Sequence, residues 1–248
     1  MEPVYTLAKG VFIPPLRLGL RWTIEGAHLL PPKGPIILAS NHHSYLDPLT
    51  LAYVADRRDR RVRFLAKAEL FEKRGLGPLL RSIHQIPVER GTKNSGEALD
   101  AAIEAIAQGE CVAVFPEGTI SLDLDPMPGK SGAARLARAT GAPVLPVGLW
   151  GTHRILFKGR KPRWRVGVPQ VAVVRPALHI ASHDHVREAT DRIMDEICAC
   201  VRRARELYPE RPGADEDQWW WRDPDTAQLR SVRGSPGRPR DVAIEETA

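Results

Sequence analysis

The sequence predicts an α/β fold: a single domain with a central mixed, partly parallel sheet flanked by helices. Short apolar runs bounded by turn residues alternate with segments of helical periodicity, which is typical of a sheet covered by helices. At 248 residues the chain suits one domain with terminal appendages and can bury a substantial core. We therefore expect one domain over residues 21–208, an N-terminal segment over 1–20 and a C-terminal tail over 209–248.

The N-terminal segment carries apolar side chains at helical spacing. These residues are Val4, Leu7, Ala8, Val11 and Phe12. The pair Pro14-Pro15 is expected to stop this helix, because proline lacks a backbone N–H and its ring crowds the preceding turn. An amphipathic helix of this kind fits a membrane surface and equally fits the protein's own core. We expect membrane association, with docking on the core as the alternative.

Four apolar runs are expected to form strands, and three segments are expected to form helices. The strands are residues 36–39, 111–115, 144–149 and 171–174, and the helices are residues 97–107, 131–140 and 184 to about 207. Gly141 follows the second helix, where a glycine commonly ends a helix. Because ligands gather at the carboxyl ends of strands in open α/β sheets, the loops after residues 39 and 115 should face one cleft.

The composition changes after Pro209, where proline, glycine and mixed charge replace aliphatic residues. Such a segment buries little apolar surface, so most of residues 209–248 is expected to form a mobile tail. The exception is a cluster of three tryptophans at residues 219–221. We expect this cluster either to fold back onto the domain or to lie at an interface.

Charge and cysteine content restrict the setting of the protein. Lys plus Arg number 36 against 30 Asp plus Glu, a formal net charge of +6 that favours anionic partners. The three cysteines, Cys111, Cys198 and Cys200, form no even disulfide framework, which favours reduced thiols in the cytoplasm. No apolar run approaches the roughly 20 residues that span a bilayer, and the N-terminus lacks a signal peptide, so any membrane contact is expected to be peripheral.

The most informative motif follows the first predicted strand and reads NHHSYLDP over residues 41–48. A neutral imidazole such as that of His42 can take a proton from a hydroxyl at physiological pH. A carboxylate on its other ring nitrogen, here Asp47, fixes the tautomer and stabilises the imidazolium. The His-x4-Asp pair therefore predicts activation of an alcohol. Asp47 followed by Pro48 also fits a helix start with aspartate as the N-cap, and both roles can coexist.

A second motif follows the predicted strand over residues 111–115 and reads PEGT over 116–119. Gly118 lets the backbone approach a ligand closely, while Glu117 and Thr119 offer a carboxylate and a hydroxyl to its polar groups. The motif therefore predicts a grip on a polar ligand. An ordinary Pro-Glu-Gly turn is the alternative.

Three cations have positions suited to an anionic ligand. Arg90 ends one apolar, strand-like run, Lys67 ends another, and Lys130 lies just before the second predicted helix. The planar guanidinium of arginine matches a phosphate or carboxylate with two hydrogen bonds, and lysine adds a point charge. Each alone is also typical of a solvated surface charge.

Together these motifs resemble the glycerolipid acyltransferase family of the PlsC type, which includes lysophosphatidic acid acyltransferases. The resemblance covers roughly residues 36–150 and rests on four blocks in the family's order. They are residues 41–48, residues 64–70 with 86–91, residues 115–119 and the run VLPVG at residues 144–148. Four ordered motifs are much more specific than any one of them.

The resemblance implies a mechanism. His42 is expected to be the general base that deprotonates the acceptor hydroxyl, with Asp47 as its partner. The hydroxyl then attacks the thioester of an acyl-CoA or an acyl carrier protein directly, with no cofactor, metal ion or covalent acyl-enzyme. The sequence agrees, because it contains no Gly-x-Ser-x-Gly elbow that would supply a serine nucleophile.

The same resemblance assigns residues to the acceptor. Arg90 resembles the family's phosphate-binding arginine, and Lys67 and Lys130 are expected to add positive charge beside it. The block that holds the acceptor's glycerol portion corresponds to Glu117, Gly118 and Thr119. Residues 144–148 are expected to form a strand that shapes the cleft.

One position departs from the family's pattern. The third block commonly continues from threonine to an arginine, and here Ile120 follows Thr119. Either the other cations suffice for a phosphate, or the acceptor has a different head group. The expected reaction converts lysophosphatidic acid to phosphatidic acid in phospholipid biosynthesis, with glycerol 3-phosphate, a lysophospholipid or a glycolipid as alternative acceptors.

Three other classes of protein are disfavoured. A metal-dependent hydrolase built on His42, His43, Asp47 and His84 lacks His-Glu-x-x-His spacing, and side chains of adjacent histidines diverge. A nucleic-acid-binding module would need more aromatic residues than this chain offers beside its basic clusters. The intact residues His42, Asp47, Arg90 and Glu117 argue against an inactive lipid-binding relative.

Two basic stretches suit an anionic membrane surface. Residues 154–165 contain six cations together with Leu156, Phe157 and Trp164, and residues 57–63 are also rich in arginine. We expect a cytoplasmic protein that associates peripherally with the inner face of the cell membrane. Solvated loops are the alternative for both stretches.

Overall fold

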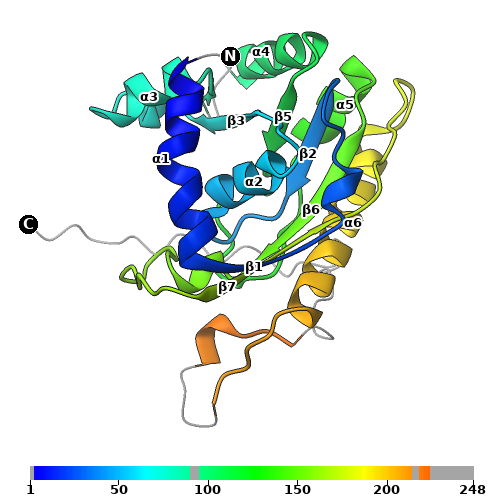
Figure 1. The fold of residues 1–248 in the computed structure, drawn as a ribbon. Helices are drawn as coiled ribbons and strands as arrows, with labels where there is room; N and C mark the ends of the chain where they lie inside the picture. The colour runs from blue at the N-terminus through cyan, green and yellow to red at the C-terminus, as the bar shows by residue number, and fades with distance from the viewer. Residues whose placement is uncertain (1–2, 90–94, 214–217, 224–248) are drawn as a thin grey trace, which may run out of the picture.

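The computed structural model describes residues 3–89, 95–213 and 218–223. Its seven-stranded sheet has the order β1-β7-β6-β2-β5-β3-β4 (Figure 1). The strands are β1 (Leu20–Glu25), β2 (Ile36–Ser40), β3 (Val62–Lys67), β4 (Ile86–Val88), β5 (Cys111–Val114), β6 (Val144–Trp150) and β7 (Val168–Val174). Neighbouring strands are parallel except β6 and β7, which are antiparallel. The predicted mixed, partly parallel α/β sheet is confirmed.

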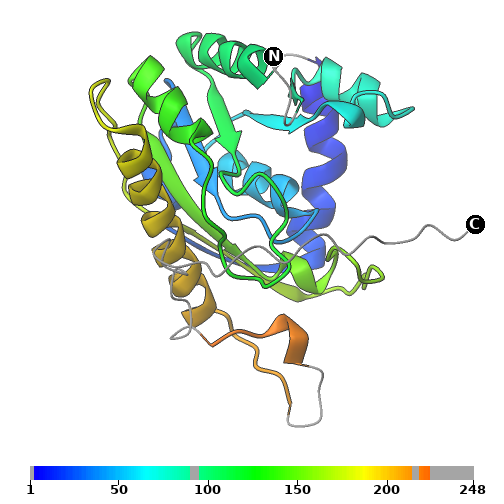
Figure 2. The same ribbon diagram turned by 180° about the vertical axis from the view of Figure 1, so that it is seen from behind.

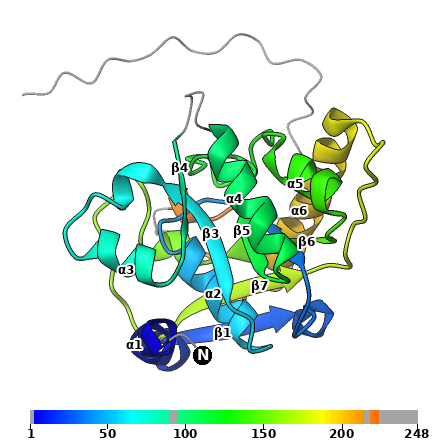
Figure 3. The same ribbon diagram turned by 90° about the horizontal axis from the view of Figure 1, so that it is seen from above.

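Helices cover both faces of this sheet. They are α1 (Pro3–Gly19), α2 (Asp47–Asp56), α3 (Leu76–Ser82), α4 (Ser95–Ala107), α5 (Gly132–Thr140) and α6 (Val186–Glu206). Helices α4, α5 and α6 lie on one face, and α2 with α1 lies on the other (Figures 2 and 3). Alternate residues of β2 supply both cores, because Ile37 packs with the first layer and Leu38 packs with α2.

The four predicted strands and three predicted helices are all present, with ends shifted by a few residues. The sheet also contains β1, which the apolar-run criterion missed. Side chains of β1 alternate between partly buried and exposed, with Trp22 and Ile24 on the covered side. This alternation is the pattern of an edge strand, and β1 pairs only with β7 at the margin of the sheet. An apolar run marks a buried strand but not an edge strand.

The expectation that Pro14-Pro15 ends the first helix is wrong. Helix α1 runs from Pro3 to Gly19 with both prolines inside it. Tertiary bonds hold its two ends, because the indole N–H of Trp22 donates to the carbonyl of Leu16 at 2.7 Å and the hydroxyl of Tyr5 accepts from the backbone N–H of Val62 at 3.3 Å. Contacts with α2 and β1 outweigh the lost helical hydrogen bonds.

The three tryptophans fold back onto the domain, which is one of the two predicted arrangements. Residues 218–220 form a short 3-10 helix in which Trp220 is 2% exposed. The guanidinium of Arg154 lies 3.8 Å from the ring centroid of Trp220, and that of Arg160 lies 4.1 Å from the ring of Trp219. The tail over 209–248 is thus partly packed, and residues 214–217 and 224–248 lie outside the described residues.

Two further expectations concern the state of the cysteine thiols and the way the protein contacts a membrane. All three cysteines are buried and unpaired, and burial raises the pKa of each thiol to about 12. In the part of the chain that the structure describes, none of the helices combines the length and apolar character that crossing a membrane requires.

Candidate active site

The predicted base and acid meet at the carboxyl end of β2. The Nδ1 atom of His42 lies 3.0 Å from Oδ2 of Asp47, so the two form one hydrogen-bonded pair. Asp47 is fully buried, whereas the side chain of His42 is 14% exposed. The ring of His42 stacks on Phe115 with a centroid distance of 4.3 Å, which fixes the plane of the imidazole.

Asp47 also has the structural role that the sequence suggested, but in a different form. It is the first residue of α2 instead of its N-cap, which is Leu46. Its Oδ2 accepts hydrogen bonds from the backbone N–H groups of His43 and Ser44, both at 2.7 Å. The carboxylate therefore holds the preceding loop and positions His42 at the same time.

Several opposing effects set the charge of Asp47. Burial would raise its pKa, but the electrostatic interaction with the imidazoles of His43 and His42 and the hydrogen bonds from His42 and Thr152 outweigh burial and lower the pKa to about 2. The carboxylate is therefore ionised at neutral pH. It accepts a hydrogen bond from Nδ1 of His42, which carries the proton. The second ring nitrogen of His42 is left as a base on the side of the cavity.

Glu117 joins the two loops that form the site. It is 3% exposed, and its carboxylate accepts from the backbone N–H of His42 at 2.7 Å and from that of Met127 at 2.9 Å. Burial raises its pKa to about 8, although both backbone donors oppose this shift. The backbone N–H of Ser121 also donates to the carbonyl of His42 at 2.8 Å. These bonds clamp the loop after β5 to the loop after β2, as the sheet topology predicted.

The other residues of the second motif lie beside this clamp. Gly118 has φ +69°, and a Cβ there would lie 2.9 Å from Nζ of Lys130, so the lysine side chain packs over the glycine. Thr119 is exposed and lines the cavity. Lys130 is exposed at the surface. The structure thus brings three predicted acceptor residues together, while their contact with an acceptor stays a prediction.

The two remaining predicted cations differ in their positions. Lys67 lines the cavity and pairs with Glu69 at 2.8 Å, with 52% of its side chain exposed. Arg90 lies outside the described residues, so its predicted role toward a phosphate stays a prediction.

A cavity of about 610 Å³ opens beside His42. Its walls come from α1, α2, β3, α3 and the segments after β5, and they are mostly apolar. The apolar side chains include Ala8, Phe12, Ile13, Leu16, Leu49, Ala52, Phe64, Leu65, Leu80, Ile83, Phe115 and Ile120. The helix that the sequence placed either on a membrane or on the core therefore forms one wall of this cavity.

Lys158 is a cavity residue that sequence reasoning assigned only to a basic surface stretch. It lines the same cavity as His42 and Thr119. Its segment is tied to the first motif, because the hydroxyl of Ser44 donates to the carbonyl of Leu156 at 2.5 Å. Within the described residues, Lys158 forms no ion pair. No local pattern could have placed it there, since its position depends on the contact between the loop after β6 and the loop after β2.

The two histidines of the first motif have different environments. Within the described ranges 3–89, 95–213 and 218–223, no group of three or more His, Cys, Asp and Glu side chains is arranged to hold a metal ion. His43 is turned away from the cavity and is 1% exposed, with Asn41 and Thr152 as its partners. The two adjacent histidines therefore have different surroundings, as the sequence predicted.

Comparison with known proteins gives one consistent result. The Acyltransferase family model matches residues 21–150. The chain is 29% identical to a 1-acyl-sn-glycerol-3-phosphate acyltransferase of Bacillus subtilis over 181 residues, which cover 72% of this chain and 83% of the relative. It is 31% identical to the alpha form of the same enzyme from Bos taurus over 206 residues, covering 79% of this chain and 70% of the relative.

Plastid and structural relatives extend this comparison. The chain spans 44% of the chloroplastic 1-acyl-sn-glycerol-3-phosphate acyltransferase BAT2 of Brassica napus, at 31% identity over 155 residues. The crystal structure of the 1-acyl-sn-glycerophosphate acyltransferase PlsC from Thermotoga maritima superposes with a TM-score of 0.64 at 27% identity, over 85% of this chain and 80% of that chain. The matched region contains the His42–Asp47 pair and the loop of Glu117, and the chain belongs to the Acyltransferase family.

Proposed function

We propose that this chain is a lysophosphatidic acid acyltransferase that moves a fatty acyl group from a thioester donor to the free hydroxyl of lysophosphatidic acid. The observation that carries the proposal is the His42–Asp47 pair at the mouth of an apolar cavity of about 610 Å³. Pockets that hold small molecules typically measure about 300–1,000 Å³. The names of the related acyltransferases support the same acceptor.

The reaction needs one base and no covalent enzyme intermediate. The unprotonated ring nitrogen of His42 takes the proton of the acceptor hydroxyl. At the same time the hydroxyl oxygen forms a bond to the carbonyl carbon of the thioester. The tetrahedral intermediate then expels the thiolate, which receives the proton from the imidazolium. The products are phosphatidic acid and free thiol. Asp47 stabilises the imidazolium during this cycle through its 3.0 Å contact with Nδ1.

The cavity divides the substrates by polarity. Its apolar walls from α1, α2 and β3 suit an acyl chain, whereas His42, Thr119, Lys67 and Lys158 are among its polar groups. Lysines attract a phosphate, and Arg90 is proposed to contribute as the family resemblance implies. Acyl-CoA and acyl carrier protein both fit as donor, because the thioester is common to them.

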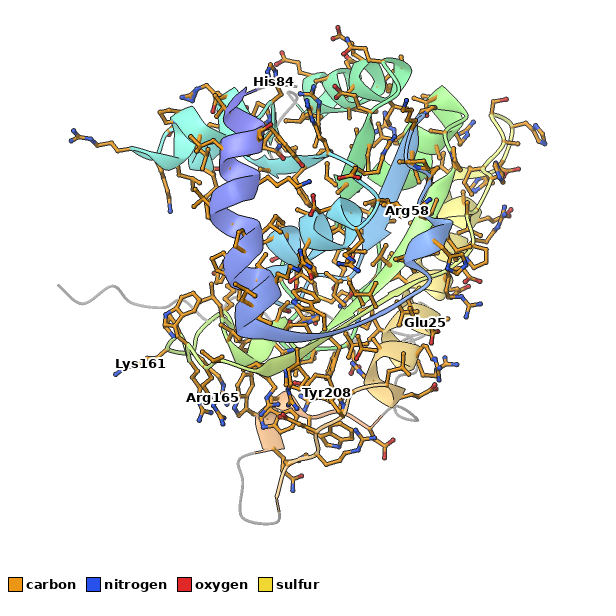
Figure 4. All side chains as sticks on the ribbon, in the orientation of Figure 1. Glu25, Arg58, His84, Lys161, Arg165 and Tyr208 are labelled. Atoms are coloured by element: carbon orange, nitrogen blue, oxygen red, sulfur yellow. The ribbon has the colours of Figure 1, made fainter. Side chains whose placement is uncertain are left out.

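The acyl substrates also suggest contact with a membrane. The outer side of α1 exposes Leu7, Val11 and Leu18, and the segment after η3 (Thr152–Arg154) exposes Trp164 and Val166. The backbone N–H of Gly167 donates to the carbonyl of Gly19 at 2.7 Å, so this segment adjoins the C-terminal end of α1. Figure 4 shows Lys161 and Arg165 pointing away from the body near the end of α1. We propose that this apolar and basic face rests on an anionic membrane surface.

Three arginines of the other predicted basic stretch bond to groups of the protein itself, while Arg57 and Arg61 are exposed. Arg58 and Arg60 donate to the backbone carbonyls of Leu30 and Gly34, and Arg63 pairs with Glu110. These arginines stabilise loops and are poorly placed for a lipid surface. The membrane proposal therefore rests on α1 and the segment that contains Trp164.

An assay of thiol release tests the proposed function. Purified protein is given palmitoyl-CoA with lysophosphatidic acid, glycerol 3-phosphate or lysophosphatidylcholine, and free thiol is measured. Release should require lysophosphatidic acid, and His42→Ala should lower kcat by about 10²- to 10⁴-fold, the usual contribution of a general base. His183→Ala is the matched control, because His183 is exposed on the loop before α6.

Two results would contradict the proposal. Unchanged kcat in a folded His42→Ala protein would remove the base from the mechanism. Thiol release that responds to another acceptor but not to lysophosphatidic acid would replace the substrate while leaving the reaction class intact.

A further inference from the structure

The side-chain amide of Asn41 has only one possible orientation. Its Oδ1 accepts from the backbone N–H of Leu149 at 2.8 Å, and its Nδ2 donates to the carbonyl of Leu149 at 3.1 Å. A backbone N–H only donates and a carbonyl only accepts. The backbone N–H and carbonyl of Leu149 in β6 therefore decide which side of the amide carries the nitrogen.

This orientation sets the tautomer of His43. Nδ2 of Asn41 lies 2.7 Å from Nδ1 of His43, and its second N–H makes that ring nitrogen an acceptor. Burial lowers the pKa of His43, in keeping with a neutral ring. A neutral imidazole that accepts at Nδ1 carries its single proton on Nε2.

The chain of hydrogen bonds continues to Thr152. Nε2 of His43 lies 3.0 Å from the hydroxyl oxygen of Thr152, which must accept because Nε2 bears the proton. The hydroxyl has one hydrogen, and it lies 2.6 Å from Oδ1 of Asp47. Thr152 therefore donates to the carboxylate. Solvent has little access to these hydrogen bonds, because the four residues that form them, Asn41, His43, Asp47 and Thr152, are each at most 2% exposed.

The chain ends at the base of the proposed reaction. With Oδ1 of Asp47 held by Thr152, its Oδ2 accepts from the backbone of His43 and Ser44 and from Nδ1 of His42. In this series of hydrogen bonds, from the N–H of Leu149 to the hydroxyl of Thr152, each donor is directed toward the carboxylate of Asp47. The proton of His42 is then fixed on Nδ1, and its Nε2 is the atom free to accept a proton.

We propose that Asn41, His43 and Thr152 are positioning residues, which transmit a fixed hydrogen-bond direction from the Leu149 peptide to Asp47 and so keep His42 in its basic tautomer. This inference rests on the proposed function, because His42 is the base there. None of the three residues needs to touch substrate. Thr152 lies 105 residues from Asp47 in the sequence, so the tertiary fold alone creates the contact.

Substitution of Thr152 tests this role. Thr152→Val keeps the shape but removes the hydroxyl, and it should lower kcat for acyl transfer about 10- to 100-fold, as loss of an orienting partner commonly does, with KM unchanged. Thr152→Ser keeps the hydroxyl and should restore most of kcat. The matched control is Thr190→Val, because the hydroxyl of Thr190 is also buried but donates only to the carbonyl of Val186 at 2.7 Å.

A spectroscopic measurement on the unmodified protein makes the test independent of folding defects. Nitrogen-15 NMR of histidine-labelled protein should show His43 protonated on Nε2 and His42 protonated on Nδ1. A proton on Nδ1 of His43 would overturn the inference, as would an unchanged kcat in Thr152→Val. If the protein acylates no acceptor, the proposed function fails separately, and the two tautomers still decide whether the chain of bonds exists.

Discussion

Two buried acidic residues, Asp47 and Glu117, hold the loops of this site. Asp47 begins α2, holds the preceding loop through two backbone N–H groups and bonds to the base. Glu117 was predicted to bind an acceptor, yet both of its oxygens accept from backbone N–H groups of neighbouring loops. The donors around Asp47 outweigh its burial and lower its pKa to about 2, whereas two backbone donors leave the pKa of Glu117 raised to about 8.

Lys158 is the residue whose role in acceptor recognition is most directly testable. It lines the cavity with His42 and Thr119, while Ile120 occupies the position where an arginine is common in the family. If Lys158 supplies the missing charge, Lys158→Met should raise KM for lysophosphatidic acid about tenfold, which corresponds to about 1.4 kcal/mol of lost binding. Its kcat should change little, since the lysine is not the base.

Steady-state kinetics with two acceptors would check this prediction. KM for monoacylglycerol, which lacks the phosphate, should be the same in Lys158→Met and in the parent protein. Lys161→Met serves as the control, because Lys161 is exposed nearby and does not line the cavity. An equal KM for lysophosphatidic acid in all three proteins would assign the phosphate to other cations.

At the scale of elements, close packing of α6 on β6 positions Leu149, where the series of hydrogen bonds toward Asp47 begins. A Cβ on Gly148 would lie 2.4 Å from the carbonyl carbon of Cys200, so only glycine allows this approach of helix to strand. The strand then delivers Leu149 to Asn41 and, after Gly151, Thr152 to Asp47. The fourth sequence block, residues 144–148, thus shapes the site through helix packing as well as through its strand.

The position of helix α1 in the cavity wall leads to a prediction about acyl-chain length. Ala8 lines the cavity, whereas Leu7 on the same helix is 68% exposed. A bulky side chain at position 8 should fill part of the apolar volume. Ala8→Trp is therefore expected to reduce kcat/KM for palmitoyl-CoA about tenfold while preserving activity with octanoyl-CoA, an effect equal to about 1.4 kcal/mol.

Competition between the two donors measures this preference. Leu7→Trp adds the same side chain on the outer side of α1 and should leave the preference of the parent protein intact. Equal discrimination by Ala8→Trp and Leu7→Trp would show that the wall formed by α1 does not contact the acyl chain.

At the scale of the whole molecule, apolar and basic groups gather where α1 meets the segment before β7. Trp164 is 72% exposed and Val166 is 87% exposed, which is costly in water for a surface with no partner. The double variant Trp164→Glu with Val166→Glu should lower the affinity for vesicles of anionic lipid at least tenfold, because it removes apolar contact and adds negative charge.

Vesicle sedimentation would test this prediction, with neutral lipid vesicles as a second arm. The matched control is Leu122→Glu, since Leu122 is 57% exposed but belongs to the loop after β5. Equal binding of the parent protein and the double variant to anionic vesicles would place the membrane contact elsewhere. Thiol release with a water-soluble, short-chain substrate should be preserved in the double variant, which would show that the site itself is intact.

Local patterns in the sequence determined the α/β class, the apolar strands, three of the helices and the pairing of His42 with Asp47. These features depend on periodicity or on motifs a few residues long, so neighbours in the chain suffice to reveal them. The tertiary structure alone decided that α1 continues through two prolines, that Lys158 reaches the cavity and that Thr152 holds Asp47. In each case the deciding contact joins separate elements, and its free energy is realised only when the sheet brings those elements together.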